Sequence, residues 1–291
     1  MALTDNMKGA VLMTLSMAGF TLNDACMKAL AGDLPLAQAV VLRGVLATVL
    51  IYLLGRGLGA LRFDLPAREW KLIGLRAVAE VGATYTFLSA LFNMPIANVT
   101  AILQALPLTV AMAAWLFLGE PLGWRRLLAI GVGFIGVLLI IQPGGSGFST
   151  WSIYALGTVA CVTFRDIIVR RMAKTTPSMT VAFLNAVAIT LAFALLSWGE
   201  VWAPVDARSA SLLALAAVFI FGGYLFSVMV MRVGEIGFVA PFRYTGMIAA
   251  LVVGYLFFGD WPDGLTLLGA VIVITMGLFT LYRERVLARR G

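Results

Sequence analysis

Long apolar runs separated by short connections fill almost the whole chain of 291 residues. Apolar residues make up 62% and charged residues only 12%, whereas globular domains run to roughly 45–50% apolar and about a quarter charged. A helix that spans a bilayer needs about 20 residues, and the runs bounded by charge, glycine or proline predict ten of them. The expected spans are 8–30, 36–55, 69–92, 97–118, 123–142, 151–173, 177–198, 209–233, 237–258 and 264–282. The sequence therefore predicts an all-α, multi-pass integral membrane protein whose surroundings are a lipid bilayer.

Basic residues in the connections predict the orientation of these helices. Fifteen lysines and arginines lie at the amino end, in the even-numbered connections and in the tail, whereas the odd-numbered connections carry Arg208 alone, with Lys28 just inside the first helix. The fifteen are Lys8, Arg56, Arg62, Arg68, Lys71, Arg125, Arg126, Arg170, Arg171, Lys174, Arg232, Arg283, Arg285, Arg289 and Arg290. Because short loops rich in Lys and Arg stay in the cytoplasm, we expect both termini there.

The two halves of the sequence are related by a weak internal repeat. Offsets of 140 to 142 residues align Asp24 with Asp166, Lys28 with Arg170, Pro35 with Pro177, and Gly119-Glu120 with Gly259-Asp260. Each half holds five predicted helices, and because five is odd the second half enters the membrane inverted, as in many secondary transporters. We expect residues 1–143 and 144–291 to form two inverted five-helix repeats.

Several kinds of chemistry find no support in the residues. The chain has no histidine, which removes His-based metal sites and His-based nucleophilic catalysis. Cys26 and Cys161 lie inside apolar runs, so no disulfide framework is indicated. The net charge of +7 comes from loops and the tail beside the membrane, which indicates no nucleic-acid partner. The segment 131–136 matches the dinucleotide pattern G-x-G-x-x-G, but it lies inside a helix, where it predicts close helix packing. We expect neither a cofactor nor a metal, and no enzyme.

The repeat and two local features resemble a known family. The step Gly119-Glu120-Pro121, its echo Gly259-Asp260-Trp261-Pro262, and Pro107 inside a helix resemble the EamA family of the drug/metabolite transporter superfamily. The resemblance covers essentially the whole chain, and within the family the chain is similar to YddG-type amino-acid exporters. It implies that helices one, three, four, six, eight and nine surround a central cavity, with five and ten outside. It also implies export of small metabolites, amino acids including aromatic ones above all, by alternating access across the bacterial inner (cytoplasmic) membrane.

Seven ionisable side chains lie well inside the predicted helices, away from the helix ends. They are Asp24, Arg43, Arg76, Glu80, Arg165, Asp166 and Arg243. Each costs about 2.5 to 3.5 kcal/mol near a helix centre, so they must face the interior, water or one another. Counting along the helices places Asp24 and Arg43, which could pair, near the outer face. The same count places Arg76, Asp166 and Arg243 near the inner face, with Glu80 one turn from Arg76.

These charged layers have three interpretations. They could form a gate whose ion pairs break when one side of the membrane opens, or they could be static ties between helices. Alternatively, Asp24, Glu80 or Asp166 could carry protons as the coupling ion. The gating or coupling set comprises Asp24, Arg43, Arg76, Arg165, Asp166 and Arg243.

Polar and aromatic residues at similar depths are candidates for contact with a small-molecule substrate. They are Asn23, Glu80, Thr84, Tyr85, Thr100, Gln104, Tyr224 and Tyr244. Pro107 and Pro241 are the only prolines deep inside predicted helices, and each is expected to bend its helix. Two other functions stay open: passive facilitation of the same solutes, and an intramembrane lipid-processing enzyme.

Overall fold

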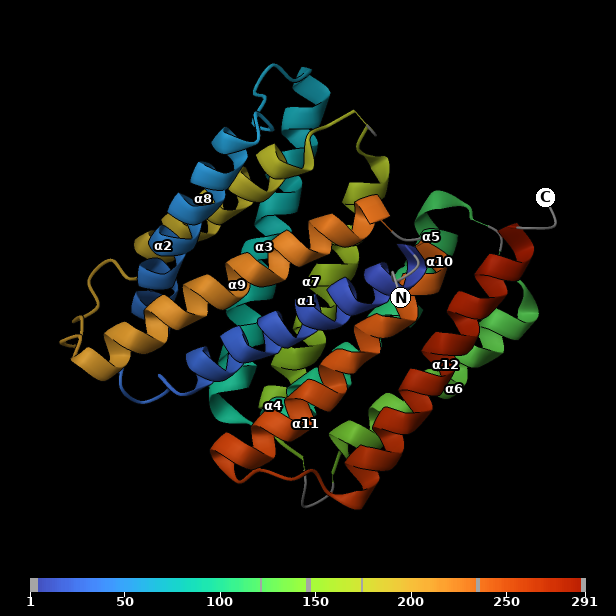
Figure 1. Ribbon diagram of the computed structural model, residues 1–291. Helices are drawn as coiled ribbons and strands as arrows, with labels where there is room; N and C mark the ends of the chain where they lie inside the picture. The colour runs from blue at the N-terminus through green and yellow to red at the C-terminus, as the bar shows by residue number, and fades with distance from the viewer. Residues whose placement is uncertain (1–4, 121, 145–147, 174, 234–235, 289–291) are drawn as a thin grey trace.

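The computed structural model describes residues 5–120, 122–144, 148–173, 175–233 and 236–288, and all regular secondary structure within these ranges is helical (Figure 1). The elements are α1 (Asp5–Lys28), α2 (Leu36–Gly57), α3 (Ala67–Asn93), α4 (Ile96–Leu103), α5 (Leu106–Leu118), α6 (Trp124–Ile141), α7 (Trp151–Arg171), α8 (Ser178–Leu196), α9 (Ala207–Val233), α10 (Ile236–Val239), the 3-10 helix η1 (Ala240–Tyr244), α11 (Thr245–Phe258) and α12 (Gly264–Ala288). Pro121, Lys174, Arg289 and Arg290 lie outside the described residues, as do the side chains of Arg232 and Arg285.

Two of the ten predicted spans are interrupted, and each interruption lies at a proline. The span 97–118 is divided into α4 and α5, with Pro107 in the first turn of α5. The span 237–258 is divided into α10, η1 and α11, with Pro241 in the first turn of η1. Proline lacks the N–H that continues a helix and its ring clashes with the carbonyl four residues earlier, which explains both breaks.

The lengths and hydropathy of the helices suit a bilayer. Within the described ranges, nine helical stretches are long and apolar enough to cross a membrane, counting 96–118 and 240–258 as one stretch each. The tenth long helix, α3, carries five charged residues and so falls outside this set. They are Arg68, Glu69, Lys71, Arg76 and Glu80. Arg68, Glu69 and Lys71 lie in the first turns at the end of the helix, whereas Arg76 and Glu80 lie deeper, which points to an interior position for that deeper part of α3.

The helix pairs with the most extensive contacts are related to one another by the repeat in the sequence. The most extensive contacts join α1 to α9, α3 to α7, α6 to α12 and α2 to α8 (Figure 1). With the offset of about 140 residues seen in the sequence, α1 corresponds to α7 and α3 to α9, so the first two contacts are equivalent. In the other two, each helix packs against its own counterpart. A two-fold relation between the halves would give this set of contacts.

The two ends of the bundle differ in charge and in packing. One end of the bundle is where α1 begins and α12 ends (Figure 1). We call it the basic end, because the helix ends and connections there carry Arg56, Arg62, Arg68, Lys71, Arg125, Arg126, Arg170, Arg171 and Arg283. Toward the opposite end a cluster of buried side chains, with the fully buried Met27, Leu91 and Phe193 among its members, fills the space between the helices. There Lys28 Nζ donates hydrogen bonds to the carbonyls of Leu91 and Met94. The bundle is therefore tightly packed at the opposite end.

Two aspartate side chains at the opposite end cap the N-termini of helices. The backbone N–H of Ser209 donates to Asp206 Oδ1 at 2.7 Å near the start of α9, and that of Thr266 donates to Asp263 Oδ1 at 2.6 Å near the start of α12. Such caps satisfy N–H groups that have no partner within the helix. The hydrogen bond from Thr266, with a second one from Gln142, holds the pKa of Asp263 below its usual value.

Helices α6 and α12 approach each other through glycine. A Cβ added to Gly136 would lie 2.9 Å from the carbonyl oxygen of Gly269, so a side chain at this position would clash with the α12 backbone. Small residues allow such close backbone contact between membrane helices. The packing role predicted for segment 131–136 is therefore confirmed at Gly136.

Candidate functional site

Two cavities of similar size lie side by side in the bundle. Cavity 1, of about 600 Å³, is lined by α1, α3, α4, α5, α7, η1, α11 and α12, and cavity 2, of about 610 Å³, by α2, α3, α7, α8 and α9. The α7 residues that line them, Asp166, Val169 and Arg170, all come from its last turns. Both cavities therefore extend toward the basic end, and both volumes fall in the range of small-molecule sites.

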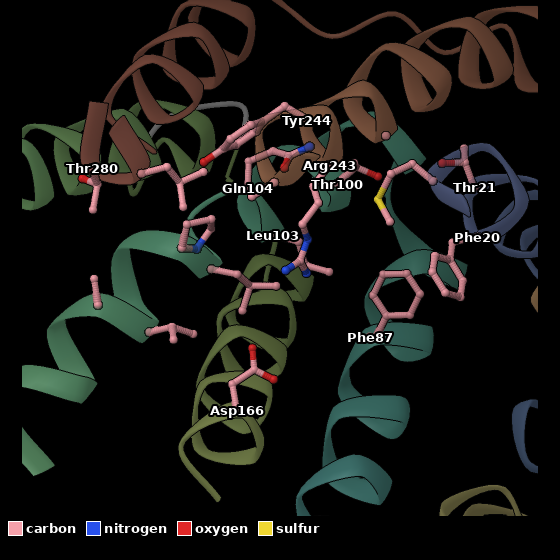
Figure 2. Close-up of a pocket in the computed structure, with 18 of the residues that line it drawn as sticks. Phe20, Thr21, Phe87, Thr100, Leu103, Gln104, Asp166, Arg243, Tyr244 and Thr280 are labelled. Atoms are coloured by element: carbon pink, nitrogen blue, oxygen red, sulfur yellow. The ribbon is translucent and has the colours of Figure 1, made fainter. Parts of the chain in front are cut away.

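Cavity 1 brings aromatic, polar and charged side chains together (Figure 2). Its polar and charged lining consists of Thr21, Asp24, Thr100, Gln104, Asp166, Arg170, Arg243, Tyr244 and Thr280. Phe20, Phe87 and Tyr244 supply ring surfaces, as Figure 2 shows. Such a mixture of apolar walls and a few convergent polar groups is typical of a site for a small organic ligand.

The helix breaks place several of these groups at the cavity. Gln104 is the residue that follows α4, directly before the interruption at Pro107. Tyr244 ends η1, directly after the interruption at Pro241. Pro107 itself and Ala240 both line cavity 1. Interrupted helices that line a polar cavity are typical of transporter sites, since the irregular backbone there is buried within protein.

Arg243 stands out because it makes no hydrogen bond or ion pair within the described part of the chain, and Figure 2 shows it pointing into cavity 1. Two further polar atoms of the lining, Tyr244 Oη and Thr280 Oγ1, are buried without a partner among the described residues. A guanidinium has five donors and favours carboxylate groups. Cavity 1 therefore offers unused hydrogen-bonding capacity to a ligand with an anionic group.

A first polar chain links the two cavities through Asn23. Arg43 Nη1 donates to Asn23 Oδ1 at 3.2 Å, and Asn23 Nδ2 donates to Asp24 Oδ1 at 2.9 Å. Arg43 lines cavity 2 and Asp24 lines cavity 1. The sequence suggested that Asp24 and Arg43 could pair. In the structure the amide of Asn23 lies between them and hydrogen-bonds both side chains.

A second polar chain runs through Arg165. This guanidinium lies 2.9 Å from Asp166 Oδ1, which lines cavity 1, and 3.2 Å from Glu80 Oε1, which lines cavity 2. Arg76 lies 3.8 Å from Glu80 one helical turn away, as their spacing predicts. Beside these chains the rings of Phe20 and Tyr224 stack edge to face, with centroids 5.4 Å apart. We call Asn23, Arg165 and this ring pair the partition between the cavities.

The charged residues are thus grouped by cavity and not only by depth. The sequence placed Asp24 and Arg43 in one layer and Asp166 and Arg243 in another, but Asp24, Asp166 and Arg243 all line cavity 1. Helices that cross at an angle bring residues of different nominal depth to one cavity. Counting residues from the end of each helix gives the depth of a side chain but does not show which cavity it lines.

Among the residues considered for substrate contact, Thr100, Gln104 and Tyr244 line cavity 1, whereas Glu80 and Tyr224 line cavity 2 and Asn23 lies in the partition. Thr84 and Tyr85 line neither cavity. The Thr84 hydroxyl donates to the Glu80 carbonyl of its own helix. Tyr85 is 45% exposed and its ring lies near Tyr154 and Phe193.

Sequence reasoning missed three kinds of lining residue. Arg170 was counted as a loop charge, but it lines both cavities and pairs with Glu120 at 2.7 Å. Phe20 and Phe87 resemble the many other apolar residues of their helices, so no local signal marks them. Asn185 could have been found, because it is the counterpart of Arg43 at the repeat offset of 142 residues.

No cluster of metal-binding side chains is present among the residues that the structure describes. Both cysteines are free, Cys26 buried and Cys161 partly buried. The chemistry of the two cavities therefore comes from guanidinium, carboxylate, amide and hydroxyl groups.

A family profile matches the chain twice, over residues 7–142 and 149–282, and its description is the EamA-like transporter family. The chain belongs to this family. It is accordingly a multi-pass membrane protein and a transporter, as its apolar helices and its two cavities independently suggest. The resemblance to the EamA family seen in the sequence is confirmed.

Curated relatives carry the names of small-molecule transporters. The pseudopaline exporter CntI of Pseudomonas aeruginosa is 27% identical over 275 residues, which cover 91% of this chain and 93% of the relative. The S-adenosylmethionine uptake transporter of Rickettsia bellii is 26% identical, over 66% of this chain and 65% of the relative. The riboflavin transporter of Rhizobium johnstonii is 25% identical, over 78% and 74%. The named directions include both export and uptake.

A solved structure shares the fold. A crystal structure of a protein superposes with a TM-score of 0.63 at 19% sequence identity, covering 96% of this chain and 98% of that one. At this identity the likeness concerns the fold alone.

Proposed function

We propose that the protein is a secondary transporter that exports small zwitterionic metabolites, first among them amino acids with apolar or aromatic side chains. The observation that carries the proposal is the free guanidinium of Arg243 in a cavity whose other walls bear two carboxylates and aromatic rings. Arg243 would bind the substrate carboxylate, and Asp24 and Asp166 would face its ammonium group. Phe20 and Phe87 would contact the apolar side chain.

Alternating access would operate by movement of two inverted repeats, residues 1–143 and 144–291. The equivalent contacts of α1 with α9 and of α7 with α3 support this relation. The excess of basic residues at the end where α1 begins supports cytoplasmic termini, in a bacterial inner membrane. Both cavities extend toward that end while the opposite end is packed, so this conformation would face the cytoplasm.

The polar chains of the partition would change during transport. Among these contacts, the ion pair of Arg165 with Glu80 joins the two repeats, so a movement of one repeat against the other would shift it. The contacts of Arg43 with Asn23 and of Arg76 with Glu80 lie within the first repeat and would move with it. Static ties between helices and proton transfer by Asp24, Glu80 or Asp166 are the competing roles. Only the last of these would couple transport to a pH gradient.

Purified protein in proteoliposomes tests the proposal. With a panel of radiolabelled amino acids, we expect saturable movement of at least one apolar or aromatic member, absent from liposomes without protein. Accumulation against a concentration gradient under an imposed pH gradient would support proton coupling, whereas equilibration alone would indicate a passive facilitator. Failure to move any zwitterion while a purely anionic or cationic solute is transported would contradict the proposed substrate class.

A further inference from the structure

We propose that cavity 2 is a second ligand site, separate from the substrate cavity, which binds a small aliphatic carboxylate. The two cavities differ in the charge of their linings. Among the described residues, the lining of cavity 1 has two carboxylates, Asp24 and Asp166, and one guanidinium without a hydrogen bond or ion pair, that of Arg243. Cavity 2 has the guanidinium groups of Arg43 and Arg76 and one carboxylate, Glu80. Arg170 is common to both linings and pairs with Glu120, so it does not alter this contrast.

Glu80 does not neutralise the two arginines of cavity 2. Its carboxylate lies 3.2 Å from Arg165 in the partition and 3.8 Å from Arg76, so the closer contact is directed out of the cavity. Arg43 hydrogen-bonds the neutral amide of Asn23, and the Asp24 carboxylate acts on it only across that amide, from the lining of cavity 1. The lining therefore keeps an excess of positive charge, which favours an anion.

Unpartnered polar atoms mark the same cavity. Arg43 is 7% exposed and its Nε has no hydrogen-bond partner among the described residues, and Nε and Nη1 of Arg76 also have none. Asn185, 5% exposed, has an unpartnered Oδ1, and a flip of its amide would present the NH₂ group to a ligand instead. Buried polar groups of this kind are normally satisfied, so their concentration here points to a bound group that accepts hydrogen bonds.

The remaining walls fix the kind of anion. Small and branched apolar side chains from α2 and α8 line the cavity, among them Ala47, Ile51, Val181, Ala182, Ala186 and Ile189. They suit a short alkyl chain and offer no further polar contact. Thr176 and Ser178, in and after the α7–α8 connection, line the cavity at the basic end. A short aliphatic carboxylate could enter there and place its oxygens near Arg43 and Arg76.

Binding of radiolabelled hexanoate to the purified full chain in nanodiscs tests the proposal, with hexanamide as a neutral competitor of the same shape. We expect saturable binding of hexanoate that hexanamide does not displace. Arg76→Gln should weaken it about tenfold or more, because a hydrogen bond to a charged group is lost. Ala186→Phe fills the cavity and should abolish it, whereas Ala194→Phe, on an exposed part of the same helix, should leave it unchanged.

Three results would overturn the proposal. Equal displacement by hexanamide would show an apolar pocket without anion recognition. Binding that survives both Arg76→Gln and Ala186→Phe, in protein that elutes as a single folded species, would place the hexanoate elsewhere. Competition by an amino acid that the protein transports would show that the two cavities are one site. The first two results do not depend on whether the amino-acid transport proposed above is correct.

Discussion

Arg243→Gln is expected to lower the initial rate of amino-acid transport in proteoliposomes by roughly 10- to 100-fold at low substrate concentration. The substitution removes the free guanidinium of cavity 1, and hydrogen bonds to a charged group contribute about 1.5 to 3 kcal/mol. Glutamine keeps most of the side-chain length, so the cavity should retain its shape. The loss should appear mainly as a raised KM, because the proposed contact is made to the substrate carboxylate in the bound state.

Two further variants make the test specific. Arg243→Lys keeps the charge and should retain part of the activity, though not all, since an ammonium cannot form the paired contact of a guanidinium. Arg125→Gln removes an exposed arginine at the basic end, outside both cavities, and should leave transport unchanged. Transport by Arg243→Gln at the rate of the unaltered protein would show that cavity 1 does not bind the substrate through this residue.

Glu80→Gln is expected to destabilise the protein strongly. The substitution leaves Arg165 and Arg76 without their shared carboxylate, in a place where Glu80 and Arg165 side chains are only 12% and 22% exposed. Removing one partner of a buried ion pair costs about 3 to 5 kcal/mol. The midpoint of thermal unfolding in detergent should therefore fall by roughly 10 °C.

The double variant Glu80→Gln/Arg76→Gln should recover part of this loss, because Arg76 has no other ion-pair partner among the described residues, whereas Arg165 keeps Asp166. Glu120→Gln is the matched control, since its partner Arg170 and Glu120 itself are 37% and 46% exposed and such pairs contribute little. A loss for Glu80→Gln no larger than that for Glu120→Gln would mean that the second polar chain does not hold the partition together.

The sequence was most informative where one physical requirement decides the outcome. Apolar length predicted the membrane helices, and the missing N–H of Pro107 and Pro241 coincides with the breaks that border cavity 1. The cost of placing a charge in lipid led us to expect the ionisable side chains of the apolar helices to face the interior, and the contact of Glu80 with Arg165 is an example of this. These inferences need only length, hydropathy and backbone chemistry.

The arrangement around the cavities could not be read in the same way. Depth along a helix says nothing about the direction in which a side chain points, so Tyr85 and Gln104 looked equivalent although only Gln104 lines a cavity. The partition depends on contacts between residues far apart in sequence, such as Arg165 with Glu80. The separation into two cavities follows from the crossing of whole helices, for which a single sequence carries no local signal.

Labelling of one cysteine in cavity 1 tests most directly whether substrate binds there. In a chain with Cys26 and Cys161 replaced by serine, Thr100→Cys places a single thiol in the wall of cavity 1. We predict that a polar thiol reagent modifies it, and that a transported amino acid slows the modification in proportion to its occupancy. Ala194→Cys, which lines neither cavity, should show no such protection. Modification of Thr100→Cys at an unchanged rate under saturating substrate would contradict the account.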